Sequence, residues 1–198
     1  AEMESEGKRI NAALKHRGTW RQRKGQLSYF KLGAWNVRTM LWKLRLKKGE
    51  VNVEGQGLGK EQMLCDELDR KGISMCALSE VRWKDKGEYQ FGEYLFLYSG
   101  RGDDLSQEGV AIVLNPVMSK AWKQSGKQVE YVSSRVMSIS FSLGNDSYRV
   151  IAVYAPTFKA DDAVKDLFYG SVSAELNKAS SGDTVICLGD WNARVGIR

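Results

Sequence analysis

Polar side chains that could act on a phosphate ester follow four apolar runs of the sequence, at the points where those runs end. Asn36 follows FKLGAW, Glu80 follows SMCALS, Tyr154 ends YRVIAV, and Asp190 and Asn192 follow VICLG. In an open α/β sheet, ligands bind beyond the carboxyl ends of the strands, so these side chains could converge there. Together they offer oxygen ligands for a hard cation, a base that orients water, and donors for phosphate oxygens. This set is typical of a magnesium site with a phosphate substrate. Taken alone, each carboxylate could equally cap a helix or lie in a solvated turn.

The runs that would position these residues are short and rich in β-branched and aromatic residues. They predict strands within LSYFKLGAW, ISMCALSE, YLFLYSG, GVAIVLN, RVMSISFSL, YRVIAVYAP and DTVICLGDW. The alternation in RVMSISFSL and the turn GNDS predict a hairpin over residues 135–154. VIAVYA and ICLG are apolar on both faces, which indicates central strands covered on two sides.

Two helices are predicted between these strands. One runs from about 60 to 71, with Leu64, Cys65 and Leu68 on one face and Gly72 at its C-cap. The second begins near Asp161, and we assign its apolar stripe to the core: Val164, Leu167, Phe168, Val172 and Leu176. Helices interleaved with strands, together with one antiparallel hairpin, indicate a layered α/β sandwich.

Length and composition exclude several classes of protein. The chain has 198 residues, enough for one domain, and it is 42% hydrophobic and 27% charged, which is typical of a folded globular protein. No apolar run approaches the roughly 18 residues of a membrane-spanning helix, and the first residues contain no apolar signal region. Cys65, Cys76 and Cys187 stand far from one another in apolar stretches. They indicate buried free thiols and an intracellular location, nuclear or cytoplasmic.

The positive charge is concentrated near the N-terminus. Residues 1–31 hold eight Lys or Arg against three Glu, and residues 38–48 hold five Lys or Arg and no acid. This pattern predicts a flexible basic arm over residues 1–27, followed by one domain over residues 28–198. A basic arm followed by a basic loop favours a polyanion partner such as nucleic acid, although a solvated tail without a partner would have the same charge.

Four segments in order, GAWNVRTM, ALSEVRW, VYAPT and GDWN, resemble signature segments of the endonuclease/exonuclease/phosphatase superfamily, which includes deoxyribonuclease I and the apurinic endonucleases. The text between them, EVRWKDKGEYQFGEYLFLYSG followed by GVAIVL, is most similar to the endonuclease domains of RTE-type non-LTR retrotransposons and to related proteins of the craniofacial development protein 2 type. The likeness runs from about residue 29 to the end. It implies the N-terminal part of a four-layer α/β/β/α sandwich of the deoxyribonuclease I-like type. It also implies Mg²⁺, or Mn²⁺ in its place, as the cofactor and DNA as the partner.

The resemblance further implies a role for each matching residue. Glu80 would be the main magnesium ligand, with Asn36 near the same cation or holding a scissile phosphate oxygen. Asp190 would orient and deprotonate the attacking water, Asn192 would hold the phosphate beside it, and Tyr154 would hydrogen-bond the phosphate. The remaining matches are two arginines that contact phosphates in relatives, Arg82 and Arg135.

The resemblance also implies a part that lies beyond Arg198. Enzymes of the superfamily continue past GDWN to an aspartate near the site and a Ser-Asp-His segment. Without that segment we expect this chain alone to cleave DNA weakly, because general acid–base groups typically contribute about 10²–10⁴-fold in rate. We also expect exposed apolar sheet surface and at least one bare strand edge, covered by self-association or by a complementing chain.

The expected function is that of a magnesium-dependent endonuclease-like domain that hydrolyses DNA phosphodiester bonds, impaired in this chain. Two alternatives stay open. A non-catalytic nucleic-acid-binding or interaction module derived from a retrotransposon endonuclease would keep the basic surface without the chemistry. A phosphodiesterase for phosphoinositide or sphingomyelin head groups would keep the chemistry on another substrate, and the charge distribution favours DNA over this one.

Overall fold

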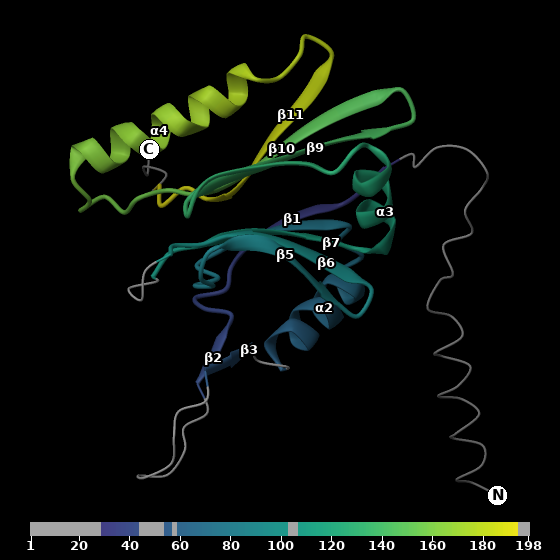
Figure 1. Cartoon of the computed structure of the whole chain (residues 1–198), viewed down its shortest axis with the longest axis horizontal. Helices are drawn as coiled ribbons and strands as arrows, with labels where there is room; N and C mark the ends of the chain where they lie inside the picture. The colour runs from purple at the N-terminus through teal and green to yellow at the C-terminus, as the bar shows by residue number, and fades with distance from the viewer. Residues whose placement is uncertain (1–28, 44–53, 57–58, 103–106, 194–198) are drawn as a thin grey trace, which may run out of the picture.

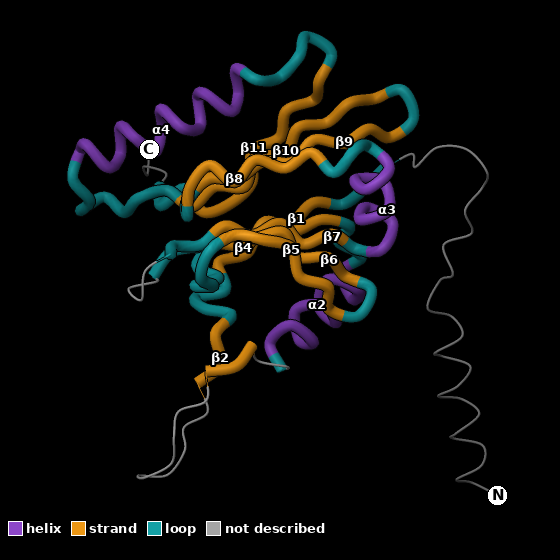
Figure 2. The backbone as a smooth tube through the Cα atoms, in the orientation of Figure 1, coloured by secondary structure: helices purple, strands orange, loops and turns teal. Residues whose placement is uncertain are grey.

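The computed structural model of the chain describes residues 29–43, 54–56, 59–102 and 107–193. The basic arm predicted over residues 1–27 lies outside them. In the described part, two mixed β-sheets pack face to face, with helix α2 on the outside of one and helix α4 on the outside of the other (Figures 1 and 2). The predicted layered α/β architecture is therefore confirmed. No helix among the described residues is long and apolar enough to cross a membrane.

The first sheet has five strands, in the order β1 (Leu32–Asn36), β4 (Met75–Ser79), β7 (Val110–Leu114), β6 (Tyr94–Ser99) and β5 (Lys86–Phe91). β1 and β4 are parallel, and the other pairs are antiparallel. A separate two-stranded ribbon, which the sequence patterns did not predict, joins β2 (Leu41–Lys43) to β3 (Glu54–Gln56).

The second sheet has four strands, in the order β11 (Asp183–Asp190), β10 (Asp146–Tyr154), β9 (Val136–Leu143) and β8 (Gln128–Ser133). β10 and β11 are parallel, while β9 pairs with both β10 and β8 in antiparallel fashion. The hairpin predicted over residues 135–154 is confirmed as β9 and β10. Each sheet therefore contains one parallel pair, and both parallel pairs end in predicted site residues.

Three helices complete the described part of the chain. Helix α2 (Lys60–Lys71) has the predicted bounds and ends at Gly72, whose φ of 63° is the left-handed conformation that glycine adopts easily. Helix α3 (Pro116–Gln124) was not predicted, although Asn115 caps it by accepting a 2.9 Å hydrogen bond from the Met118 backbone N–H and Pro116 occupies its first turn. Helix α4 (Asp162–Asn177) is the predicted second helix.

The apolar core lies mainly between the sheets. Side chains from β4, β6 and β7 meet those from β9 and β10 there, and Trp122 of α3 closes one end of this layer. Leu64, Cys65 and Leu68 of α2, which were predicted to share one face of the helix, pack on the outer face of the first sheet. The cysteines are free thiols, and Cys65 and Cys76 are buried while Cys187 is partly exposed.

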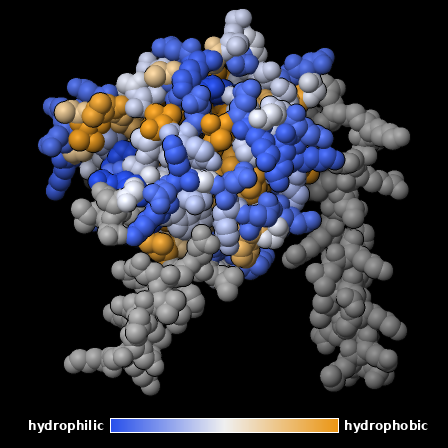
Figure 3. Space-filling view, in the orientation of Figure 1, coloured by the Kyte–Doolittle hydropathy of each residue, from blue (hydrophilic) through white to orange (hydrophobic). Residues whose placement is uncertain are grey.

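Two predictions about the second sheet are wrong. Only Phe168 and Val172 of the predicted α4 stripe are buried, whereas Val164, Leu167 and Leu176 are exposed, Leu167 by 74%. Figure 3 shows hydrophobic side chains gathered at the surface over one end of this helix. α4 packs on β9 and β10 through Phe168 and Val172, and the other three residues of the stripe lie outside that contact.

The second wrong prediction concerns ICLG. β11 was expected to be a central strand, but among the described residues it is the last strand of its sheet, and most of its residues are partly exposed.

Candidate functional site

The carboxyl ends of the two parallel strand pairs carry the predicted site residues. In the first sheet, Asn36 is the register partner of Ser79, and Glu80 follows directly. In the second sheet, Tyr154 is the register partner of Asp190. Because β1 and β11 also contact each other, the ends of the two pairs meet at one place in the molecule.

A single amide links the two carboxylates. The Nδ2 atom of Asn36 donates hydrogen bonds of 2.8 Å to Glu80 Oε1 and of 2.8 Å to Asp190 Oδ2. Glu80 and Asp190 are thus separated by one side chain, although they are far apart in sequence. The Oδ1 atom of Asn36 accepts a 3.0 Å hydrogen bond from the Arg38 backbone N–H, so the amide is held from both ends.

The backbone at these strand ends is in the left-handed conformation. Glu80 has a φ of 57°, Arg82 of 59°, Asn192 of 46° and Arg38 of 55°. Side chains other than glycine adopt this conformation at a cost of about 1–3 kcal/mol each, and such residues cluster at functional sites. Packing and hydrogen bonds in the surrounding fold must offset this free-energy cost.

Tyr154 is paired with Asp190 across the β10–β11 ladder and is largely buried. Burial, the negative charge of Glu80, a hydrogen bond to the Glu80 carboxylate and the charge of Asp190 raise the pKa of Tyr154, while Arg135 partly opposes them. The phenol therefore keeps its proton at neutral pH and donates it in a hydrogen bond.

The two predicted arginines are both tied to carboxylates. Arg82 Nη2 lies 3.2 Å from Glu80 Oε2, and the Arg82 Nε atom is buried without a partner among the described residues. Arg135 Nη2 lies 2.8 Å from Glu108 Oε1, and its guanidinium sits 4.9 Å from the centre of the Tyr154 ring. Arg135 thus joins the site through Tyr154.

Glu108 is a site residue that the sequence patterns missed. It precedes β7, and the register pair of Ser79 with Val110 brings the amino end of β7 to the carboxyl end of β4. A rule based on the carboxyl ends of strands does not find Glu108, because β4 and β7 are antiparallel.

Asn192 is placed beside Asp190 in a different way from Asn36. Its backbone N–H donates a 2.9 Å hydrogen bond to Asp190 Oδ1, and its side-chain Nδ2 donates a 2.7 Å bond to the Ala155 carbonyl. The Asp190 carboxylate therefore accepts one hydrogen bond on each oxygen. In this arrangement Asn192 fixes the turn after β11, and its side-chain amide is directed to the Ala155 carbonyl.

Gly189, directly before Asp190, lies too close to the backbone of β10 for any other residue to fit. Its φ is 143°, and a Cβ at this position would lie 1.9 Å from the Val153 carbonyl oxygen. No side chain can be accommodated there without moving β11 away from β10. The glycine thereby allows Asp190 to stand beside Tyr154.

The donor set fits a magnesium ion, which proteins commonly hold through one or two carboxylates together with waters and substrate phosphate. Glu80 and Asp190 supply the carboxylates, on either side of the Asn36 amide. Within the described ranges, no group of three or more His, Cys, Asp or Glu residues gathers as a metal site. Two carboxylates could hold a hydrated ion and would leave coordination positions for a substrate.

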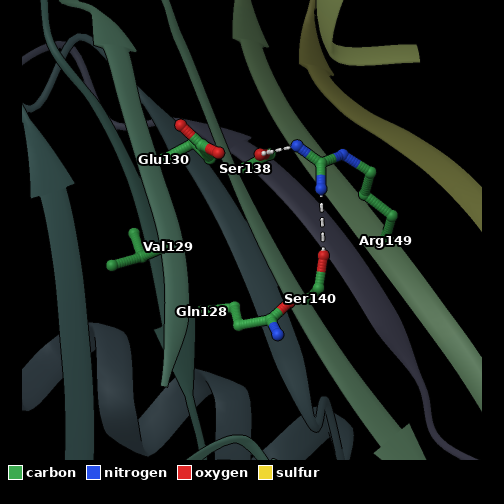
Figure 4. Close-up of a pocket in the computed structure, with 6 residues that line it drawn as sticks. All are labelled: Gln128, Val129, Glu130, Ser138, Ser140 and Arg149. Atoms are coloured by element: carbon green, nitrogen blue, oxygen red, sulfur yellow. Dashed lines mark hydrogen bonds between the residues drawn. The ribbon is translucent and has the colours of Figure 1, made fainter. Parts of the chain in front are cut away.

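A separate pocket of about 220 Å³ lies on the outer side of the second sheet, and Figure 4 shows its lining: Gln128, Val129, Glu130, Ser138, Ser140 and Arg149. Arg149 donates to the Ser138 and Ser140 hydroxyls and forms a 2.6 Å ion pair with Glu175 of α4. Its Nε donates to the Glu175 carbonyl as well. Since most of its donors are used within the chain, we assign this arginine to holding α4 on the sheet.

Comparisons with known proteins place the chain among distant relatives. No family model matches it. It is 28% identical over 165 residues to craniofacial development protein 2 of Bos taurus, a match that covers 83% of this chain and 24% of that protein. The same protein of Tragulus javanicus is also 28% identical, with 25% of its length covered. The chain thus spans about a quarter of the length of the curated relatives it matches.

Solved structures give weaker matches. A protein of the endonuclease/exonuclease/phosphatase family from Leptotrichia buccalis has a TM-score of 0.48 at 15% identity, over 83% of this chain and 67% of that one. A humanized D. rerio TDP2 has a TM-score of 0.46 at 13% identity, over 81% of this chain and 65% of that one. D. rerio TDP2 in complex with a single-strand DNA product has a TM-score of 0.43 at 13% identity, over 68% of this chain and 54% of that one.

Proposed function

We propose that this chain, a distant relative of the endonuclease/exonuclease/phosphatase superfamily with sequence similarity to craniofacial development protein 2, carries a magnesium-dependent site that hydrolyses DNA phosphodiester bonds. One observation supports this most directly. Asn36 bridges the Glu80 and Asp190 carboxylates with two 2.8 Å hydrogen bonds, at the joined ends of two sheets. The positive charge of residues 1–31 and 38–48 favours DNA as the substrate.

Each residue has a proposed part in the reaction. Glu80 would hold the metal, and Asn36 would fix that carboxylate and contact the cation or a phosphate oxygen. When bound, Mg²⁺ would neutralise negative charge on the phosphate. Asp190, oriented by hydrogen bonds on both oxygens, would accept the proton of a water molecule that attacks phosphorus in line with the leaving oxygen.

The remaining residues would bind the phosphate. Tyr154 keeps its proton and would donate it to a phosphate oxygen, and the amide of Asn192 would lie beside that oxygen. Arg82 and Arg135 would make forked hydrogen bonds to neighbouring phosphates, which a lysine cannot do. Binding at Arg82 would compete with its 3.2 Å contact to Glu80, so substrate and metal would loosen that pair together.

The first experiment measures metal binding and plasmid nicking. We expect calorimetry to show that Mg²⁺ binds the unchanged chain. We expect the Glu80→Gln variant to lose this binding. We expect nicking of supercoiled DNA to require Mg²⁺ and to fall to background in Asp190→Ala. Asp183→Ala, at the opposite end of the same strand, is the matched control and should behave as the unchanged chain.

The outcomes separate the hypotheses. Nicking that survives Asp190→Ala, or Mg²⁺ binding that is indifferent to Glu80→Gln, would contradict the proposed reaction. Weak nicking would agree with the impairment predicted from the sequence, while robust nicking would contradict that impairment alone.

A non-catalytic nucleic-acid-binding module is the second candidate, because the positive charge of residues 1–31 and 38–48 supports it equally. That module would bind DNA with a steep dependence on salt, no dependence on Mg²⁺ and no effect of Glu80→Ala.

A further inference from the structure

The Glu108 carboxylate lies among several hydrogen-bond donors on one side of the site. Its carboxylate accepts from Arg135 Nη2 at 2.8 Å and from the Ser134 hydroxyl, and it lies 3.5 Å from Arg101 Nη1. The side chains of Glu108 and Arg135 are 16% and 21% exposed. Charge-assisted hydrogen bonds that are partly shielded from water are stronger than exposed ones, so the Glu108 carboxylate can hold the guanidinium in one orientation.

The backbone of the same segment holds the turns that carry other site residues. The Glu108 carbonyl accepts a 2.9 Å hydrogen bond from the Arg82 N–H, and the Gly109 carbonyl accepts a 3.1 Å bond from the Val81 N–H. The Gly109 N–H donates a 3.1 Å bond to the Ser134 carbonyl. Residues 108–109 therefore connect the turn of Glu80 and Arg82 to the turn before Arg135.

Arg135 extends this connection to the phenol. Its Nη1 donates a 3.2 Å hydrogen bond to the Tyr154 carbonyl while its guanidinium covers the Tyr154 ring. An arginine side chain loses much conformational entropy when it is fixed, so this placement needs a partner at the other end of the guanidinium. The Glu108 carboxylate is that partner.

We propose that Glu108 is a positioning residue of this site, which holds the Arg135 guanidinium against the Tyr154 ring and thereby sets the orientation of the phenol. Its effect on cleavage rests on the proposed function, whereas its effect on Arg135 does not. A simple surface ion pair would stabilise the fold slightly and leave the phenol unaffected.

The direct test is Glu108→Gln, which keeps the shape of the side chain and removes its charge. The matched control is Glu130→Gln, because Glu130 also pairs with a cation, Lys178, but on β8 and away from the predicted residues. We expect kcat for Mg²⁺-dependent nicking to fall about tenfold in Glu108→Gln, with KM for DNA changed less than about twofold. The control should match the unchanged chain, and equal kcat values in three proteins that all cleave DNA would overturn the proposal.

A double-mutant cycle shows whether Glu108 acts through Arg135. If it does, the variant that combines Glu108→Gln with Arg135→Gln loses no more activity than Arg135→Gln alone. Losses that multiply would mean that the two residues act independently, which would overturn the proposed route.

Nitrogen-15 NMR of the Arg135 guanidinium, assigned with Arg135→Lys, tests the proposal without DNA. We expect restricted rotation of the guanidinium in the unchanged chain and in Glu130→Gln, and free rotation in Glu108→Gln. Glu108→Asp, which withdraws the charge by one methylene, should release Arg135 as well and serves if the glutamine variant does not fold. Unchanged Arg135 signals would overturn the positioning role. Released signals in a chain that never cleaves DNA would overturn the proposed reaction and leave the positioning role in place.

Discussion

Two arginine–carboxylate pairs in this molecule use the same chemistry in opposite ways. Arg149 and Glu175 are 2.6 Å apart, their side chains are 10% and 1% exposed, and Ser138 and Lys178 also donate to the Glu175 carboxylate. Arg82 and Glu80 are 3.2 Å apart, with side chains 36% and 18% exposed, and both residues adopt a left-handed backbone conformation.

The two pairs differ in how many of their hydrogen-bond donors and acceptors have partners within the chain. The pair beneath α4 has nearly all of its donors and acceptors satisfied within the chain, so it has little to offer a ligand. At the sheet ends the Glu80 and Arg82 side chains are partly exposed, and the buried Arg82 Nε atom has no partner within the described ranges. A pocket beside an arginine is therefore a weak indication of binding, whereas an arginine and a carboxylate that are only loosely paired can exchange each other for phosphate and metal.

The largest effect is expected when the buried Arg149–Glu175 pair is disrupted. Glu175→Ala leaves Arg149 buried without its counter-charge, and we expect the free energy of unfolding to fall by about 3–5 kcal/mol, as measured by urea denaturation. Lys165→Ala, which removes an ion pair with the exposed Asp162 side chain on the same helix, is the control and should change it by less than about 1 kcal/mol. A loss in Glu175→Ala as small as that of the control would remove the distinction between the two pairs.

A smaller effect is expected at the Arg82–Glu80 pair. Arg82→Lys keeps the charge but cannot make forked hydrogen bonds to phosphate, so KM for DNA should rise about tenfold in the nicking assay. Stability should change by less than about 1 kcal/mol, because exposed ion pairs contribute little. A large drop in stability with unchanged KM would mean that Arg82 is structural, like Arg149.

The smallest expected effect concerns pH. Burial alone would raise the pKa of Glu175, but hydrogen bonds from Lys178, Ser138 and Arg149, with the charge of Arg149, bring it below the ordinary value of 4.5. A lowered folded-state pKa contributes stability that is present above the unfolded value and is lost as the pH falls through the folded value. The stability difference between the unchanged chain and Glu175→Gln should therefore be constant near pH 7 and shrink below pH 4.5. A difference that stays constant down to pH 3 would contradict this linkage.

Much of the fold was predictable because buried strands have a simple pattern. The runs that contain β4, β7, β9 and β10 are apolar or alternating, and all were found. β5 and β8 were missed, although Tyr89 and Phe91, and likewise Val129 and Tyr131, face inward at every second position. These are edge strands whose other residues are polar, so the apolar signal is halved. The Asn-Pro start of α3 was a capping signal that went unused.

The candidate site was partly predictable for a topological reason. Asn36, Glu80, Tyr154 and Asp190 all end strands that turn out to be parallel neighbours, so one rule about carboxyl ends was enough to bring them together. Glu108 stands at the amino end of an antiparallel strand, where that rule does not apply. The catalytic roles of these residues stay predictions, because they depend on a metal and a substrate rather than on strand order.

The left-handed turns at the strand ends have a consequence for engineering. Glycine or asparagine at positions 38, 80 and 82 would relax the main chain, so a search for heat-tolerant variants would favour replacing Arg38, Glu80 and Arg82. Such a search would select more stable proteins that lack the side chains of the candidate site. Thermal screening and screening for DNA nicking should therefore select different sequences from the same library.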